Sequence, residues 1–214
     1  NSGSNLLRCL KTVLLRKYNW LCGIYASMMN LPIYLLGALW GIPYLERVDH
    51  MSFSVAAQAS GLLFLGTMVG AILVGLISDW LKNRLLVMKI GAILAIAVFS
   101  VLIIFKIHSP LFIDTLFFLL GLVTSTQVLA YPMVVEYNGD EFASTATSVI
   151  SMMCLGGGAL AQPIFGWLMT LKGGGSVSSS GLPVYSVASY EFAISMLMVT
   201  FVIGLLVSFV LKKK

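Results

Sequence analysis

Polar side chains recur along two apolar segments of this sequence at the spacing of one helical face. In the first segment the recurring residues are Ser27, Asn30, Tyr34, Gly37 and Gly41. A later segment repeats the pattern with Gly121, Thr124, Gln127 and Tyr131. Residues three and four positions apart share a face of a helix. The amides, hydroxyls and phenols of each set could therefore hydrogen-bond a polar solute inside a cavity.

A second interpretation of these faces stays open, because polar side chains in apolar helices also hydrogen-bond neighbouring helices and so hold them together. Gln162 has the same ambiguity, since it either lines the cavity or satisfies the backbone carbonyl that the following Pro163 leaves unpaired. Under the cavity interpretation the predicted solute contacts are Asn30, Tyr34, Thr124, Gln127, Tyr131 and Gln162.

Residues that would support catalysis or bind a metal do not form recognisable sets. The sequence has no H-E-x-x-H, G-x-S-x-G or P-loop motif. The three cysteines fit neither a zinc site nor a disulfide framework, and His50 and His108 fall in expected loops. Asp114 falls near one end of an apolar segment, where we expect water to reach it and the helix dipole to favour it. We therefore expect no enzyme activity, no metal and no cofactor.

The elements that position these residues follow from composition. Of 214 residues, 59% are hydrophobic and 10% are charged, whereas a soluble domain carries about 25% charged residues. A membrane-spanning helix needs roughly 20 apolar residues. The sequence predicts an all-α membrane protein with six spans, at about 20–39, 56–78, 85–105, 110–131, 142–171 and 190–211.

Lysine and arginine predict the orientation of the spans. Ten of the 13 basic residues fall on one side of the predicted topology: Arg8, Lys11, Arg16, Lys17, Lys82, Arg84, Lys89, Lys212, Lys213 and Lys214. The other side has Arg47, Lys106 and Lys172. The positive-inside rule then predicts that both termini lie in the cytoplasm. The protein would be an integral protein of the cytoplasmic or plasma membrane. These basic residues orient the spans, so we expect no nucleic-acid partner.

The predicted spans divide into two sets of three. In each set the first span has a polar face and the third is the most uniformly apolar, as two inverted three-helix repeats of a transporter would be. Residues 1–5 look like a linker or an artificial remnant, and residues 6–214 form the membrane unit. Gly156, Gly157, Gly158 and Pro163 in the fifth span predict either close helix packing or a bend. Residues 173–181 predict a flexible loop.

The turn after the second span carries a familiar motif. Gly75-Leu-Ile-Ser-Asp79-Trp-Leu-Lys82-Asn-Arg84 resembles the G-x-x-x-D-R-x-G-R-R signature of the major facilitator superfamily. Gly75, Asp79 and Arg84 match the signature, whereas Trp80, Lys82 and Asn83 depart from it. Residues 40–44, 143–148 and 162–167 add to the resemblance, which extends over residues 6–211.

The resemblance implies the C-terminal six-helix half of a twelve-helix transporter, namely helices seven to twelve. In this family the first and fourth helices of a half line the central cavity, the second and fifth contact the other half, and the third and sixth are peripheral. The aspartate of the signature, here Asp79, would secure a cytoplasmic gate with basic groups that include Arg84. Gly75 would belong to the same gate motif.

The expected function is secondary transport of a small polar organic solute, such as an amino acid, nucleoside or sugar, by alternating access. The expected partners are the solute, the lipid bilayer and either the N-terminal half of the transporter or a second copy of this chain. Two alternatives remain. One is a half-size protein that acts as a homodimer, and the other is a membrane scaffold that transports nothing.

Overall fold

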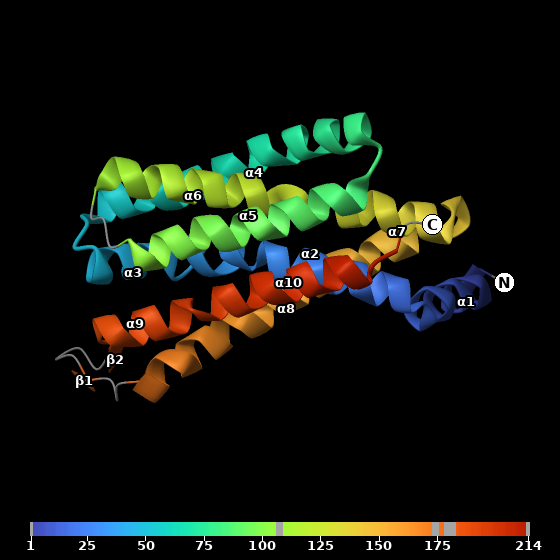
Figure 1. Ribbon diagram of the computed structural model, residues 1–214. Helices are drawn as coiled ribbons and strands as arrows, with labels where there is room; N and C mark the ends of the chain where they lie inside the picture. The colour runs from blue at the N-terminus through green and yellow to red at the C-terminus, as the bar shows by residue number, and fades with distance from the viewer. Residues whose placement is uncertain (1, 106–108, 173–175, 178–182, 213–214) are drawn as a thin grey trace.

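A computed structural model describes residues 2–105, 109–172, 176–177 and 183–212. These residues form a helical bundle that contains six helices long and apolar enough to span a membrane. The spans are Lys17–Gly37, Phe53–Leu81, Arg84–Ile104, Pro110–Asn138, Asp140–Lys172 and Val187–Val210. Both chain termini lie at one end of the elongated bundle (Figure 1). We call this the terminal end, and we call the opposite end, which holds α3 (Gly41–Val48) and the two strands, the distal end.

The first half of the chain supplies three spans. α1 (Ser2–Leu15) precedes them, and the first span consists of α2 (Lys17–Pro32) followed by a π-helical turn, η1 (Ile33–Gly37). α4 (Phe53–Leu81) and α5 (Arg84–Ile104) are the second and third spans. Residues 1–5 were expected to be a linker or an artificial remnant, and residues 2–5 lie within α1.

The second half supplies the other three spans. The fourth consists of α6 (Pro110–Thr124), a 3₁₀ turn η2 (Ser125–Leu129) and α7 (Ala130–Asn138). After the short turn η3 (Asp140–Phe142), α8 (Ala143–Lys172) is the fifth span. α9 (Val187–Ile194) and α10 (Met196–Val210) form the sixth.

A two-residue strand, β1 (Ser176–Val177), pairs antiparallel with β2 (Pro183–Val184) between the fifth and sixth spans. The flexible loop predicted over residues 173–181 otherwise lies outside the described residues, as does His108.

The prediction of six spans is confirmed, and all but one of their ends fall within three residues of the predicted positions. The exception is the fourth span, which was predicted to end near Tyr131 and continues to Asn138. Pro132 is the third residue of α7. Its missing N–H therefore falls in a first turn, where backbone N–H groups have no partner within the helix. The first turn of α7 therefore accommodates Pro132 after η2, and the proline does not end the span.

Helix packing follows a regular pattern. α4 packs most extensively on α6, α2 packs on α8, and α10 packs on both α2 and α5. At the α4–α6 contact a side chain on Gly66 would overlap the Phe118 carbonyl, and one on Gly121 would overlap the Leu63 carbonyl. Small residues let helix backbones approach this closely. Gly66 is therefore required by the contact between these two spans.

Candidate functional site

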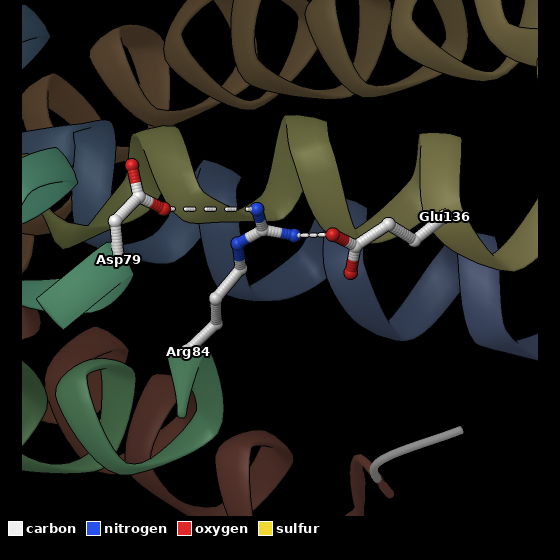
Figure 2. Close-up of polar contacts among 3 residues, drawn as sticks. All are labelled: Asp79, Arg84 and Glu136. Carbon is white, nitrogen blue, oxygen red and sulfur yellow. Dashed lines mark hydrogen bonds and ion pairs between the residues drawn. The ribbon is translucent and has the colours of Figure 1, made fainter. Parts of the chain in front are cut away.

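A charged cluster lies at the terminal end of the bundle, where α4, α5 and α7 meet. Figure 2 shows the Arg84 guanidinium between the carboxylates of Asp79 and Glu136. Its Nη1 donates a hydrogen bond to Glu136 Oε1, and its Nη2 lies 3.9 Å from Asp79 Oδ1. The structure thus brings together the two charged motif residues that the sequence analysis singled out. It adds Glu136, which sequence reasoning did not pair with Arg84.

The turn between α4 and α5 positions this cluster. Lys82 closes α4 in the left-handed conformation, with φ 49° and ψ 29°. Asn83 then caps α5, because its side-chain oxygen accepts a hydrogen bond from the Leu86 N–H at 3.2 Å. Left-handed backbone is strained for residues other than glycine. Position 82 is the glycine of the signature that the motif resembles, so the backbone adopts there a conformation that glycine favours.

The cluster borders a cavity of about 350 Å³ at the terminal end. Its lining residues are Tyr18, Ser78, Asp79, Lys82, Asn83, Arg84, Leu85, Met133, Glu136 and Tyr137. Ser78 is 1% exposed, and its hydroxyl oxygen has no hydrogen-bond partner in the structure. The walls combine charged, phenolic and apolar groups from spans one, two, three and four.

A second cavity of about 330 Å³ lies at the distal end, among α3, α5 and α9. Tyr44, Asp49, His50 and Glu191 are its polar lining residues. Tyr44 is buried, and this burial, together with the carboxylates of Asp49 and Glu191, raises the pKa of its phenol. His50 has a φ of 54°, a left-handed conformation that histidine adopts only occasionally.

The polar face of the first span packs on the fifth. The Tyr34 ring lies against Gly158, where an added Cβ would come within 2.5 Å of the ring. Gln162 Nε2 donates to the Tyr34 carbonyl at 3.4 Å. Asn30 is half-buried one turn before Tyr34. Tyr34 and Gln162 therefore meet at the contact between α2–η1 and α8.

The predicted residues of the fourth span have different surroundings. Thr124 is fully buried and donates its hydroxyl to the Leu120 carbonyl at 2.7 Å. Gln127 is 8% exposed, and the Tyr131 hydroxyl lies 3.3 Å from the Ser151 hydroxyl of α8. In this conformation the Thr124 hydroxyl is hydrogen-bonded within its own helix, whereas the Tyr131 hydroxyl contacts the fifth span.

Tyr25 is a polar residue of the first span that the sequence analysis did not select. It is fully buried, and its hydroxyl donates to the Met88 carbonyl of α5 at 2.8 Å. The same oxygen lies 2.8 Å from the Thr126 hydroxyl of η2. Tyr25 lies two residues before Ser27 and therefore outside the helical face that the spacing of three and four defines. The spacing could not identify it.

The glycines of α8 serve different purposes. A side chain on Gly157 would overlap the Ser27 hydroxyl, and Gly158 faces Tyr34, so both allow close approach of α2. A side chain on Gly156 would meet no atom within 4 Å, and the same holds for Gly75 of the motif. α8 continues as a helix through the exposed Pro163. Close packing thus accounts for Gly157 and Gly158 but not for Gly156 or Gly75.

The two spans with polar faces share one further property. Each begins as a regular α-helix, of 16 residues in α2 and 15 in α6, and then changes to a five-residue turn of another helical type, η1 or η2. Pro32 immediately precedes η1, and the buried polar residues Ser125, Thr126 and Gln127 lie in η2. η1 forms the last five residues of the first span, whereas η2 lies inside the fourth. Departures from α-helical hydrogen bonding of this kind free backbone groups and often mark functional positions.

Metal binding has no support within the described residues, which contain no group of three or more His, Cys, Asp and Glu able to hold an ion. Cys22 and Cys154 are buried free thiols and Cys9 is half-buried.

Comparison of the sequence with protein-family models and with curated proteins gives no match. The fold defines a broad class of protein but not a family. The six long apolar helices fit a membrane protein.

Proposed function

We propose that this chain is the C-terminal six-helix half of a major facilitator superfamily transporter. The observation that carries the proposal is a symmetry in the helix packing. Exchanging spans one and four, two and five, and three and six leaves the set of packed pairs unchanged. Under this exchange the contact of α2 with α8 becomes that of α6 with α4, and the contact of α10 with α2 becomes that of α5 with α6. Inverted three-helix repeats produce this relationship.

The two turns that depart from the α-helix, η1 at the end of the first span and η2 inside the fourth, support a solute site between these spans. Under the same exchange, the span containing η1 corresponds to the span containing η2. Interrupted helices at corresponding positions of two repeats indicate where a transporter binds its solute. Asn30, Tyr34, Gln127 and Tyr131 lie in or next to these turns. The face carries no charged group, which favours a small polar organic solute such as an amino acid, nucleoside or sugar.

The charged cluster supports the role of a gate at the terminal end. Asp79 and Arg84 hold the α4–α5 turn beside α7 through Glu136, so they join the second, third and fourth spans. Separation of these charges would let the helix ends move apart as the transporter changes state. The left-handed Lys82 supports the resemblance at a position where the sequence departs from the signature.

The partner in this proposal is the N-terminal six-helix half. α4 and α8 each leave an apolar stripe exposed, and the stripe on α4 includes Leu65, Met68, Ile72 and Leu76. The other half covers part of these stripes and lipid covers the rest. Both termini lie at one end of the bundle, and the basic residues clustered there support a cytoplasmic position for that end.

The test begins with binding. Individual amino acids, nucleosides and hexoses are screened for a thermal shift of the transporter that contains this chain, and uptake of the best solute is then measured. We expect Asn30→Ala with Gln127→Ala to lower its uptake at least tenfold. The control Thr115→Ala, which removes an exposed hydroxyl of α6, should leave uptake unchanged. Unaltered affinity and rate in the double variant would overturn the assignment of this face.

A further inference from the structure

Two lysines lie over phenylalanine rings, one at each end of the bundle. At the terminal end, the Lys89 ammonium of α5 lies 4.7 Å from the centroid of the Phe209 ring of α10. At the distal end, the Lys172 ammonium of α8 lies 5.5 Å from the centroid of the Phe192 ring of α9. Both contacts are cation–π interactions. Their surroundings differ, and this difference indicates what Lys89 binds.

The contact of Lys89 with Phe209 lies on the outer surface of the third and sixth spans. α5 and α10 pack side by side (Figure 1), and nearer the distal end the rings of Phe99 and Phe201 meet with their centroids 5.5 Å apart. Phe209 itself is 60% exposed. The large apolar side chains exposed near the pair on the two helices are Leu86, Ile90, Leu206 and Val210. The ammonium is therefore held at a surface suited to lipid acyl chains.

The depth of Lys89 in its span matches the boundary between acyl chains and headgroups. α5 has 21 residues, a length of about 31 Å, and the hydrocarbon core of a bilayer is about 30 Å thick. Lys89 is the sixth residue of α5, so its backbone lies about 7.5 Å from the terminal end of this helix. Phe209 is the second-last residue of α10. The flexible lysine side chain thus brings its charge toward the headgroups, as lysines near span ends do.

No carboxylate balances the charge of Lys89 on the helices around it, within the described part of the chain. Neither α5 nor α10 contains an acidic residue. The helices that pack on them contribute Asp79, Asp114 and Glu191. Asp79 faces Arg84 at 3.9 Å. The other two lie at the distal end, where Asp114, which water was expected to reach, is only 8% exposed because α6 packs against α4.

The contact at the distal end has acidic neighbours. Glu191 directly precedes Phe192 in α9. Glu191 and Asp49 also line the distal cavity. Lys172 therefore belongs to an end of the bundle where carboxylates lie close to the cation–π contact, whereas Lys89 has an apolar surface and an aromatic ring around it.

We propose that Lys89, held by Phe209, binds the phosphate of an anionic phospholipid in the leaflet at the terminal end. Lys212, an exposed residue that directly follows the C-cap of α10, adds a second positive charge on the headgroup side of Phe209. The acyl chains lie along the exposed apolar residues of α5 and α10. Basic residues next to a span attract anionic lipids in this way. Phe209 is a positioning residue, because it holds the ammonium without contacting the phosphate.

The shape of this surface favours a lipid over a free phosphate ion. The site has no enclosing walls, so a soluble phosphate would gain contacts with the lysines alone, whereas a lipid also covers the apolar side chains beside them. The inference rests on the proposed function in one respect, which is that the N-terminal half covers α4 and α8 and leaves α5 and α10 to lipid. It does not depend on whether the protein transports a solute.

Native mass spectrometry of the full chain in detergent tests the proposal. Phosphatidylglycerol and phosphatidylcholine are titrated separately, and the dissociation constant of the first bound lipid is measured. We expect the wild type to bind phosphatidylglycerol more tightly. Lys89→Gln should weaken the binding of phosphatidylglycerol about fivefold and leave that of phosphatidylcholine unchanged. Lys89→Arg, which keeps the charge, should retain the wild-type affinity.

Lys172→Gln is the matched control, because it removes one positive charge from the other cation–π contact. It should leave the affinity for phosphatidylglycerol unchanged. Phe209→Leu should weaken this affinity about twofold, since the ammonium loses its aromatic partner, whereas Phe209→Tyr should retain it. Circular dichroism verifies that each variant is folded before its lipid affinity is compared.

Three results would overturn the proposal. Equal affinities of the wild type and Lys89→Gln for phosphatidylglycerol would show that Lys89 is not at the site. Equal losses in Lys89→Gln and Lys172→Gln would show that net charge alone attracts the lipid. Displacement of the lipid by glycerol phosphate at equal concentration would show that a phosphate suffices without acyl chains. Because no solute is present, a failed transport assay leaves these measurements unaffected, and the two proposals can fail separately.

Discussion

The aromatic ring of Tyr34 lies directly against the backbone of Gly158, so that the first and fifth spans touch at a position where only glycine fits. An added Cβ at residue 158 would come within 2.5 Å of two ring carbons, Cγ and Cδ2. Gln162, one turn further along α8, donates to the Tyr34 carbonyl. The contact therefore fixes the η1 turn through both the ring and the backbone of a single residue.

Gly158→Ala is expected to destabilise the protein, whereas Gly156→Ala should stabilise it. Both positions lie inside α8, where alanine is favoured over glycine by about 0.5–1 kcal/mol. At residue 158 overpacking against Tyr34 adds a penalty of about 1–3 kcal/mol, and at residue 156 there is no atom to meet within 4 Å. Unfolding in detergent measures both free energies. Equal effects at the two positions would show that Tyr34 moves away without cost.

Arg84 is expected to couple more strongly to Glu136 than to Asp79. The guanidinium donates directly to Glu136 but lies 3.9 Å from Asp79. Ion pairs of this exposure contribute about 0.2–1 kcal/mol, so the first coupling should fall within this range and the second near zero. Double-mutant cycles with Arg84→Gln, Glu136→Gln and Asp79→Asn measure both. Both couplings should shrink at high salt, and a larger coupling to Asp79 would contradict the observed geometry.

The positions of the spans could be predicted because hydropathy depends on local sequence and a spanning helix has a fixed minimum length. The continuation of the fourth span beyond Pro132 could not, since the 3₁₀ turn η2 that accommodates it depends on packing against α4 and α5. The missed interaction of Glu136 has a related cause, because Arg84 is 52 residues away in the sequence. Spacing placed Thr124 on a polar face but did not reveal that its hydroxyl is satisfied by Leu120.

At position 82 a glycine variant is expected to be more stable than an alanine variant, the reverse of their order inside a helix. Lys82 adopts a φ of 49°, and left-handed backbone costs about 1–2 kcal/mol for residues with a Cβ. Lys82→Gly should therefore be more stable than Lys82→Ala, by about 1 kcal/mol. At the exposed position 159 within α8, the control Ala159→Gly should instead lose about 0.5–1 kcal/mol. Greater stability of the alanine variant at residue 82 would mean that the turn relaxes to another conformation.

Tyr44 is expected to make the stability of the protein fall at high pH. Burial raises the pKa of its phenol, and the carboxylates of Asp49 and Glu191 raise it further. The unfolded chain therefore releases this proton first as the pH passes the ordinary tyrosine value of about 10. The stabilisation is complete below that pH and is lost as the pH rises toward the pKa of the folded state. One proton corresponds to a slope of up to about 1.4 kcal/mol per pH unit. The measurement is the free energy of unfolding of the wild type and of Tyr44→Phe as a function of pH. The difference between the two proteins should stay at its neutral-pH value up to about pH 10. Above that pH the free energy of the wild type should fall more steeply. Parallel curves would show that Tyr44 is already accessible to water in the folded protein.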